Sequence, residues 1–206
     1  MKLVLGSDLS FLLEYGYNLT GIPKDQMKIG YITTASKGDR GDFSRNLKYA
    51  IRENGYDFEE IDIEGKSRGE IKTFFKDKNI IHMEGGNTFY LLRAIRETGF
   101  AAILKELLEE GRVYIGTSAE SYIMCPTIEV SDWDTTGKPR FDVSDFTALN
   151  YVPFVLKVHY TDNKEADIKE HMKNLKYPLR ILKDGQGILA EDGKYTFFGK
   201  ENETIL

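Results

Sequence analysis

A serine marks the point in this sequence where an apolar run changes into a helical pattern. Residues 112–125, RVYIGTSAESYIMC, read as a buried strand that breaks at Gly116 and Thr117, with a helical run beginning directly after Ser118. In open α/β sheets ligands bind at the carboxyl ends of strands, and a helix N-terminus supplies free N–H groups that stabilise an oxyanion. Ser118 therefore suits a nucleophile, although a serine in this place is also a preferred helix N-cap.

A Gly-Gly-Asn turn in residues 82–90, HMEGGNTFY, is the second candidate, because it again follows an apolar run and precedes a helical pattern. Paired glycines let the backbone approach a ligand closely, so Gly85 or Gly86 could donate an N–H to the same oxyanion. A tight strand-to-helix connection uses such a turn equally well. The segment has neither the GxGxxG pattern nor the phosphate-loop lysine, so it does not indicate a nucleotide site.

His159 is the third candidate, since it ends an apolar run and meets the polar residues of the segment 157–163, KVHYTDN. An exposed strand end suits a general base, but a histidine there can also be a half-buried structural residue. Of the other two histidines, His82 lies inside an apolar run and His171 lies in a charged helical pattern. The sequence lacks the HExxH type of spacing, so zinc chemistry is disfavoured and no metal or cofactor is expected.

These candidates need a scaffold that brings strand ends together. Short apolar runs alternate with helical patterns along the first 125 residues, as parallel strands with crossover helices do. The chain is therefore predicted to form one α/β domain over residues 1–206, a three-layer, open, mostly parallel sheet with helices on both faces. The predicted strands are 3–5, 29–33, 57–63, 79–83 and 112–115, and the predicted helices are 42–54, 69–75, 88–97 and 100–110.

The pattern changes after Cys125. Residues 129–150 are polar and read as an excursion over the surface rather than another strand-helix unit. The chain then returns through the apolar run 152–158 and a polar helix near 165–175. Its tail has two strand-like pieces around a turn at residues 192–193.

Composition limits the classes of partner. The net charge is −5, and no run of five like charges occurs, so neither nucleic acid nor an anionic membrane is an expected partner. No apolar stretch reaches the length of a membrane span, and the N-terminal residues lack a secretory apolar region. The single cysteine, Cys125, fits a small core residue in a reducing compartment, so a cytoplasmic protein is expected.

Four segments, EGGNTFYLL, YIGTSAES, IMCPTIE and KVHY, occur in this order and spacing. Together they resemble the dipeptidase E family of serine peptidases, peptidase family S51, which includes alpha-aspartyl dipeptidases and cyanophycinase-like enzymes. The resemblance covers residues 79–163 closely and the rest in outline. It implies a fold like that of the class I glutamine amidotransferases, which is flavodoxin-like, with serine replacing cysteine at the strand-to-helix turn.

The resemblance also implies roles for individual residues. Ser118 would be the nucleophile, His159 the general base, and an acidic residue of the polar excursion would orient the imidazole. Aligning from Ser118 places that acidic position near Trp133, so Asp132 and Asp134 are both candidates, with Asp134 slightly favoured.

The remaining site residues surround the reacting carbonyl. The backbone N–H groups near Gly86 and Ala119 would hold the oxyanion. Gly85, Asn87 and Glu120 are expected to contact the substrate.

Two glutamates depart from the family pattern, because Glu120 and Glu84 stand where the family usually has glycine. A carboxylate beside an oxyanion hole opposes negative charge on the carbonyl unless it is turned away or paired. One hypothesis is that Glu120 points into the pocket and binds the α-ammonium group of a substrate. The rival hypothesis is that Glu120 marks a weakened or lost activity.

The leading prediction is a serine exopeptidase that acts on dipeptides or short peptides, as a monomer or a homodimer. Aspartyl-dipeptide members carry an arginine after the histidine, whereas the segment 163–174, NKEADIKEHMKN, has lysines but no arginine, which argues against specificity for an N-terminal Asp. The alternative is a catalytically impaired homologue that serves as a small-molecule binding module. A nucleotide-binding protein of this fold class would need a phosphate signature that the sequence lacks.

Overall fold

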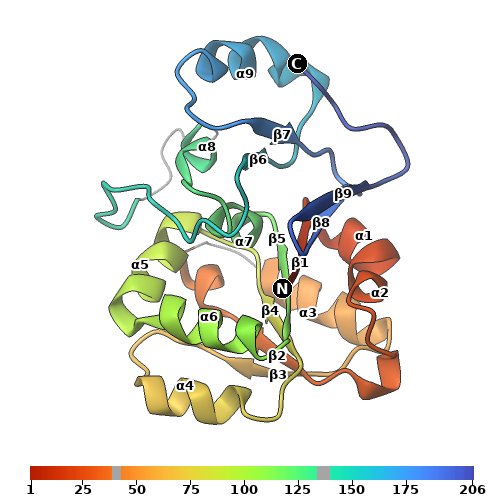
Figure 1. The fold of residues 1–206 in the computed structure, drawn as a ribbon, viewed down its shortest axis with the longest axis vertical. Helices are drawn as coiled ribbons and strands as arrows, with labels where there is room; N and C mark the ends of the chain where they lie inside the picture. Colours follow the sequence, from red (N-terminus) through yellow and green to blue (C-terminus); the bar gives the residue numbers. More distant parts are fainter. Residues whose placement is uncertain (39–42, 134–139) are drawn as a thin grey trace.

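Within the described residues, 1–38, 43–133 and 140–206, the computed structural model contains a seven-stranded sheet in the order β3-β2-β4-β5-β1-β8-β9 (Figure 1). The strands from β3 to β1 in this order run parallel, whereas β8 is antiparallel to β1 and β9 is antiparallel to β8. This confirms the predicted open, mostly parallel α/β sheet. The strands are β1 (Lys2–Gly6), β2 (Ile29–Ile32), β3 (Phe58–Ile61), β4 (Ile80–Met83), β5 (Val113–Thr117), β8 (Gly187–Glu191) and β9 (Lys194–Phe198).

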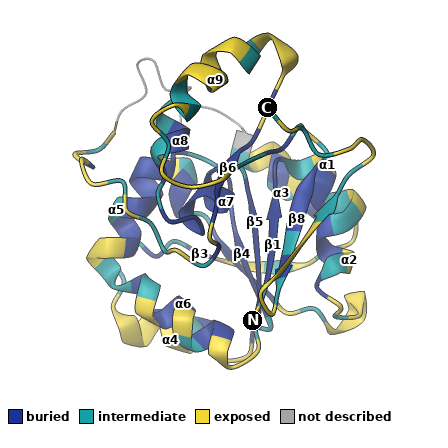
Figure 2. Ribbon diagram, turned by 45° about the horizontal axis from the view of Figure 1, so that its top comes forward, coloured by how far each residue is buried: buried dark blue, intermediate teal, exposed yellow. Residues whose placement is uncertain are grey.

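Helices cover both faces of this sheet, and each face has its own apolar cluster. Figure 2 shows the strands buried between helices whose outer sides are exposed. One face carries α1 (Leu9–Phe11), η1 (Leu12–Gly16), α2 (Tyr17–Leu19) and α3 (Phe43–Glu53). The other carries α4 (Arg68–Phe75), α5 (Thr88–Thr98), α6 (Phe100–Glu109) and α7 (Ala119–Ile123).

Local sequence explains where the helices begin and end. The side chain of Ser67 accepts a hydrogen bond from the Glu70 N–H while the Glu70 side chain accepts from the Ser67 N–H, a capping box that starts α4. Asn87 caps α5, and Gly99 ends it with a φ of 66°, a conformation that glycine adopts without steric cost. These signals fix where α4 begins and where α5 begins and ends.

A two-stranded parallel sheet of β6 (Val155–Lys157) and β7 (Leu179–Ile181) lies above the large sheet in the view of Figure 1. It is accompanied by α8 (Glu129–Asp132) and by α9 (Glu165–Met172). Three further turns are 3₁₀-helical, at η2 (Lys24–Gln26), η3 (Thr34–Gly38) and η4 (Asp162–Lys164). The small sheet matters because the chain leaves both of its strands at the same end, beside α7.

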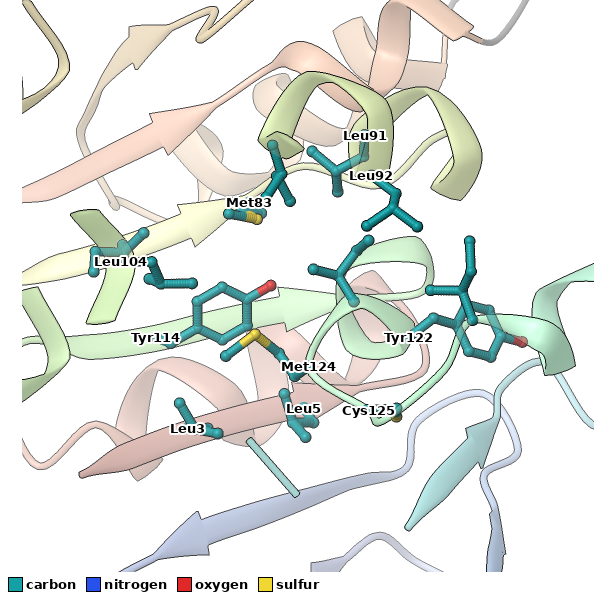
Figure 3. Packing of buried hydrophobic residues seen from close by; sticks show 14 of the residues in the cluster. Leu3, Leu5, Met83, Leu91, Leu92, Leu104, Tyr114, Tyr122, Met124 and Cys125 are labelled. Atoms are coloured by element: carbon teal, nitrogen blue, oxygen red, sulfur yellow. The ribbon is translucent and has the colours of Figure 1, made fainter. Parts of the chain in front are cut away.

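The segment that follows the serine is packed firmly into the core. Figure 3 shows Met124 and Cys125 beside Leu3 and Leu5 of β1, with Tyr114 of β5 next to them. All five side chains are fully buried. Burial raises the pKa of the Cys125 thiol to about 12, so this thiol stays protonated and inert at neutral pH. The position of Ser118 is therefore set by rigid packing behind it.

The sequence-based element boundaries differ from the structure in a few places. β5 continues to Thr117, two residues beyond its predicted end, which brings the strand directly to the serine. Residues 9–19 form helical turns that the apolar pattern did not indicate. In the described part of the chain, no helix has the length and apolar character needed to cross a membrane.

Candidate active site

Ser118 sits between β5 and α7 with a backbone conformation that few residues adopt. Its φ is 60° and its ψ is −115°, and its side chain makes no capping hydrogen bond to the helix. A non-glycine residue with positive φ costs about 1–3 kcal/mol, and such strain persists only where the surroundings impose it. The cap interpretation of this serine is therefore excluded by the geometry, and the hydroxyl is directed elsewhere.

The turn around Ser118 leaves room for nothing larger than glycine at position 116. A Cβ there would lie 2.8 Å from both the Glu120 Cβ and the Tyr114 ring. Ser121 holds the turn from behind, because its hydroxyl donates to the carbonyl oxygens of Gly6 at 2.8 Å and Gly116 at 3.0 Å. The Ser118 N–H also donates to the Gly6 carbonyl, at 3.1 Å. β1 thus anchors the strained turn.

The structure brings His159 to Ser118. The distance from His159 Nε2 to Ser118 Oγ is 3.0 Å, and the distance from His159 Nδ1 to Asp184 Oδ1 is 2.6 Å. A carboxylate only accepts hydrogen bonds, so Nδ1 carries the proton in this arrangement and the Nε2 lone pair faces the serine hydroxyl. The three side chains form the chain of contacts that activates a serine nucleophile.

The pairing of β6 with β7 explains why His159 and Asp184 meet. Lys157 pairs with Ile181 at the parallel ends of these strands, and His159 and Asp184 follow within three residues. The register continues past the strands, because the Leu182 N–H donates to the Lys157 carbonyl at 2.8 Å and the Tyr160 N–H donates to the Leu182 carbonyl at 3.1 Å. Both side chains consequently leave the small sheet on the same side.

Both members of this pair are open to solvent. The side chain of His159 is 44% exposed and that of Asp184 is 62% exposed. Water therefore screens their interaction, and the arrangement leaves the imidazole reachable by a substrate from outside.

Asp184 takes the position that the sequence analysis assigned to Asp132 or Asp134. The Asp132 carboxylate accepts a hydrogen bond from Arg140 at 2.8 Å, in the segment after α8. Asp134 lies outside the described residues. The correction has a physical reason. His159 follows β6, and Asp184 follows β7, the strand that pairs with β6, whereas Asp132 belongs to the polar excursion after α7.

The expected oxyanion donors lie at the ends of neighbouring strands. β4 pairs with β5 so that Met83 is opposite Gly116, and the turns with Gly86 and Ala119 both continue from this edge. Ala119 is the first residue of α7, so its N–H has no partner within that helix. Gly86 packs closely on the turn that follows β2, since a Cβ at Gly86 would lie 2.4 Å from the carbonyl oxygen of Ala35 in that turn.

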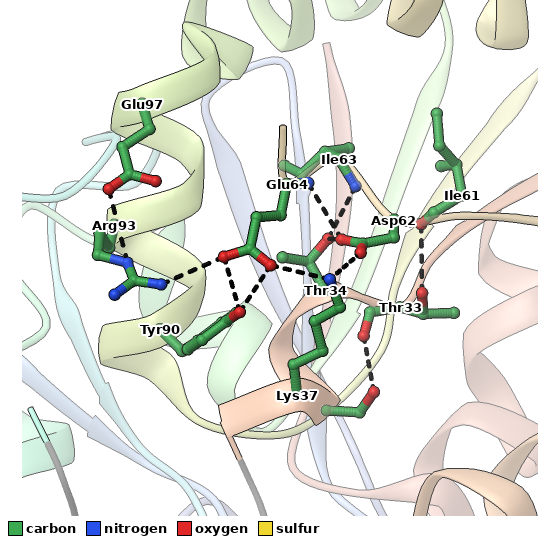
Figure 4. Close-up of polar contacts among 11 residues, drawn as sticks. Thr33, Thr34, Lys37, Ile61, Asp62, Ile63, Glu64, Tyr90, Arg93 and Glu97 are labelled. Atoms are coloured by element: carbon green, nitrogen blue, oxygen red, sulfur yellow. Dashed lines mark hydrogen bonds and ion pairs between the residues drawn. The ribbon is translucent and has the colours of Figure 1, made fainter. Parts of the chain in front are cut away.

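A polar cluster holds this turn, η3, against α5 (Figure 4). Lys37 forms ion pairs with Asp62 and, at 2.8 Å, with Glu64. Tyr90 donates to Glu64 at 2.7 Å, and Arg93 pairs with the same carboxylate at 3.2 Å. These hydrogen bonds from Lys37 and Tyr90 lower the pKa of Glu64, so it remains charged and keeps η3 beside the Gly86 turn.

The other expected substrate contacts are less exposed than a binding role would suggest. Asn87 is 2% exposed, and its side-chain oxygen accepts from the Tyr90 N–H at 3.0 Å as the cap of α5. Gly85 is buried. Glu120 is also fully buried, behind Ser118, with its carbonyl oxygen accepting from the Tyr114 hydroxyl at 2.9 Å. These residues therefore shape the floor of the site.

Glu84 is a buried acid at the end of β4. It is fully buried, and neither of its carboxylate oxygens has a hydrogen-bond partner among the described residues. Burial raises its pKa, while the Ser44 and Ser36 hydroxyls and the positive charge of Lys48 act in the opposite direction. The neutral form of Glu84 is thus favoured relative to an exposed glutamate.

The remaining histidines do not join the site. His82 is fully buried, its Nδ1 lies 3.1 Å from the Tyr17 hydroxyl, and burial lowers its pKa to about 3. His171 stacks on Trp133 with ring centroids 4.8 Å apart. Over residues 1–38, 43–133 and 140–206, no three His, Cys, Asp or Glu side chains are grouped so as to hold a metal ion.

Comparison with known proteins identifies the family of this chain. The model of peptidase family S51 matches residues 15–198. An uncharacterized peptidase of Pasteurella multocida is 31% identical to this chain, over 93% of this chain and 94% of its own length. The chain belongs to peptidase family S51. An uncharacterized peptidase of Listeria monocytogenes is 32% identical over 76% of this chain and 75% of its own length.

A solved structure extends the S51 assignment to the fold. The crystal structure of a candidate peptidase E protein from Listeria monocytogenes matches with a TM-score of 0.81 and 27% identity, covering 97% of this chain and 98% of that one. This likeness is consistent with the flavodoxin-like fold expected from the sequence. As a member of family S51, the chain is a serine-type peptidase.

Proposed function

We propose that this S51 peptidase hydrolyses dipeptides or short peptides through a Ser-His-Asp acyl-enzyme mechanism. The observation that carries the proposal is the continuous contact from Ser118 Oγ to His159 Nε2 at 3.0 Å and from His159 Nδ1 to Asp184 Oδ1 at 2.6 Å. Three side chains from separate segments converge in this way where the serine hydroxyl is directed away from any capping role.

The first half of the reaction forms an ester. Neutral His159 takes the proton of Ser118 as the serine oxygen attacks the peptide carbonyl carbon. The backbone N–H groups of Ala119 and Gly86 are the proposed donors to the resulting oxyanion. The C–N bond then breaks as the protonated imidazole gives its proton to the leaving amine, and the acyl group stays on Ser118.

The second half consumes a water molecule. His159 takes a proton from water, which attacks the ester, and the proton returns to Ser118 as the acid product leaves. Asp184 keeps the imidazole in one tautomer and stabilises the positive charge that it carries between these steps. No cofactor or metal enters this sequence of steps.

The short-substrate part of the proposal concerns Glu120. Glu120 follows Ser118 by two residues in α7 but is fully buried, so the hypothesis that its carboxylate recognises the α-ammonium group of a peptide requires that this acid becomes accessible when the substrate binds. Because residues 163–174 contain no arginine, we do not expect a preference for substrates with an N-terminal Asp. A panel of Asp-, Glu- and neutral-headed dipeptides, each with a free and an acetylated N-terminus, tests both statements.

The single buried cysteine, Cys125, fits a reducing compartment, and we extend the proposal to a cytoplasmic enzyme. We also propose that it acts as a monomer or a homodimer. Sedimentation of the purified chain and fractionation of cells that produce it test these two points.

The decisive experiment compares the wild-type protein with Ser118→Ala. We expect stoichiometric labelling of the wild type by a fluorophosphonate, no labelling of the variant, and loss of dipeptide turnover by a factor of about 10³ or more. A binding module instead predicts thermal stabilisation by a dipeptide that is identical in both proteins, with no turnover in either. That result would reject the enzymatic proposal.

A further inference from the structure

Ser7 lies directly after β1 and touches both partners in the histidine-aspartate pair. We propose that Ser7 is a positioning residue that holds His159 and Asp184 in register with Ser118. This inference rests on the proposed Ser-His-Asp mechanism. It adds a fourth side chain, from the other end of the sequence, to the three that carry the chemistry.

The contacts of Ser7 are specific and mutually consistent. Its hydroxyl donates to Asp184 Oδ1 at 3.1 Å, and the backbone N–H of His159 donates to the same hydroxyl oxygen at 3.0 Å. The Ser7 residue is fully buried, although His159 and Asp184 are exposed. A buried anchor therefore adds to the solvent-screened interaction between the two side chains.

Counting protons fixes the direction of each hydrogen bond. The Ser7 hydroxyl has one proton, and a carboxylate can only accept, so that proton goes to Asp184 Oδ1. The lone pairs of the Ser7 oxygen remain for the His159 N–H. Asp184 Oδ1 thus receives donors from both Ser7 and His159 Nδ1, which orients the carboxylate toward the ring.

Ser7 also acts where the backbone needs support. His159 has a φ of 54°, a left-handed conformation that is costly for a residue with a Cβ. Its N–H is the group that Ser7 binds, so the hydroxyl helps to hold the residue in this conformation. Without that bond the imidazole would lose one of the contacts that set its distance from Ser118.

The turn that carries Ser7 is tied to the other loops of the site. The Ser7 N–H donates to the Gln186 carbonyl at 2.9 Å, and Asp8 accepts from the Gly185 N–H at 2.8 Å. The preceding carbonyl, that of Gly6, accepts from the Ser118 N–H at 3.1 Å. Hydrogen bonds from the end of β1 and the short turn after it therefore connect the nucleophile, the base and the orienting acid to one strand.

A double-mutant cycle tests whether Ser7 acts through Asp184. The variants are Ser7→Ala, Asp184→Ala, the double variant, and Ser10→Ala as the matched control, since the Ser10 hydroxyl donates to Asp8 at 2.6 Å and, among the described residues, to neither His159 nor Asp184. The readout is the second-order rate of Ser118 labelling by a fluorophosphonate, with the thermal midpoint measured on each protein. The protein used is the full chain.

We expect Ser7→Ala to lower the labelling rate roughly 10-fold to 100-fold, the range for losing a hydrogen bond to a charged group, while Ser10→Ala stays within about twofold. In the Asp184→Ala background the same Ser7→Ala change should cost less than it does in the wild type, because one of the two partners of Ser7 is already gone and only the bond from the His159 N–H is left to lose. An equal loss in both backgrounds, or wild-type labelling by Ser7→Ala, overturns the proposal.

Folding and mechanism are controlled separately. If Ser7→Ala has a lowered thermal midpoint, Ser7→Cys replaces it, since a thiol has a similar shape but is a weak donor. A slower labelling of Ser7→Cys supports the proposal, and a wild-type rate overturns it. A wild-type protein that does not label at all rejects the peptidase mechanism itself, whereas a labelled wild type with unaffected Ser7 variants rejects only the role of Ser7.

Discussion

Replacing Asp184 with asparagine tests the corrected assignment of the orienting acid. The side-chain oxygen that accepts from His159 Nδ1 and from Ser7 has a counterpart in asparagine, so the hydrogen-bonded geometry can persist. What is lost is the negative charge beside the imidazole, and the imidazole is positive only during the reaction. Asp184→Asn should therefore lower kcat more than it raises KM.

The magnitude follows from the separation and the exposure of the two groups. Opposite charges about 4 Å apart attract by about 1 kcal/mol in water and about 4 kcal/mol at an effective dielectric constant near 20. Because His159 is 44% exposed and Asp184 is 62% exposed, the lower part of this range applies. A loss of about 1–2 kcal/mol corresponds to a roughly 5- to 30-fold fall in kcat/KM.

The matched control is Asp132→Asn, which removes one of the two acids that the sequence analysis proposed for this role. Asp132 pairs with Arg140, an exposed residue, so its loss should change kcat/KM by less than about twofold. Both variants are assayed on one dipeptide at neutral pH, together with the rate of fluorophosphonate labelling. A larger effect from Asp132→Asn than from Asp184→Asn would refute the assignment of Asp184.

Two other changes probe the scaffold. Gly86→Ala places a methyl group where a Cβ would lie 2.4 Å from the Ala35 carbonyl oxygen, so the turn must shift; we expect a loss of stability of about 1–3 kcal/mol in urea unfolding and a labelling rate reduced at least about 10-fold. His82 has a pKa lowered to about 3 by burial, so the unfolded state binds the proton first as the pH falls. The contribution of His82 to the free energy of unfolding is therefore fully present above pH ~6.5, and below it falls by at most roughly 1.4 kcal/mol per pH unit. In His82→Phe, the free energy of unfolding measured in urea should depend less steeply on pH between pH 6.5 and 5.5. An unchanged slope in that variant would contradict the buried neutral state of His82.

The large sheet could be predicted because its signals are local. Parallel strands buried on both faces give continuous apolar runs, and the intervening helices show caps such as Asn87 and Gly99 within a few residues of their ends. The same locality made Ser118 visible, since a strand, a glycine and a helical run meet within one short segment. The sequence also suggested that the Gly85–Gly86 turn serves the same oxyanion as Ser118, and the pairing of β4 with β5 brings these two strand ends side by side.

Asp184 could not be found in this way, because its signal is not local. β6 and β7 have three residues each, and they are joined through η4 and α9 rather than by a tight turn. Pairing across such a connection depends on tertiary packing, which propensity does not report. The apolar residues before Lys183 and the Asp-Gly pair at 184–185 show a strand that ends in a turn, but not which strand it pairs with.

The two glutamates that replace family glycines pose a physical question about the oxyanion. A charged carboxylate behind Gly86 would raise the energy of a negative carbonyl oxygen. Glu84 is fully buried, and burial raises its pKa, which favours the neutral acid. The protonated form of Glu84, which burial favours, adds no charge beside the proposed donors. By favouring the protonated form, burial of Glu84 reduces the electrostatic repulsion that this glutamate would exert on the oxyanion.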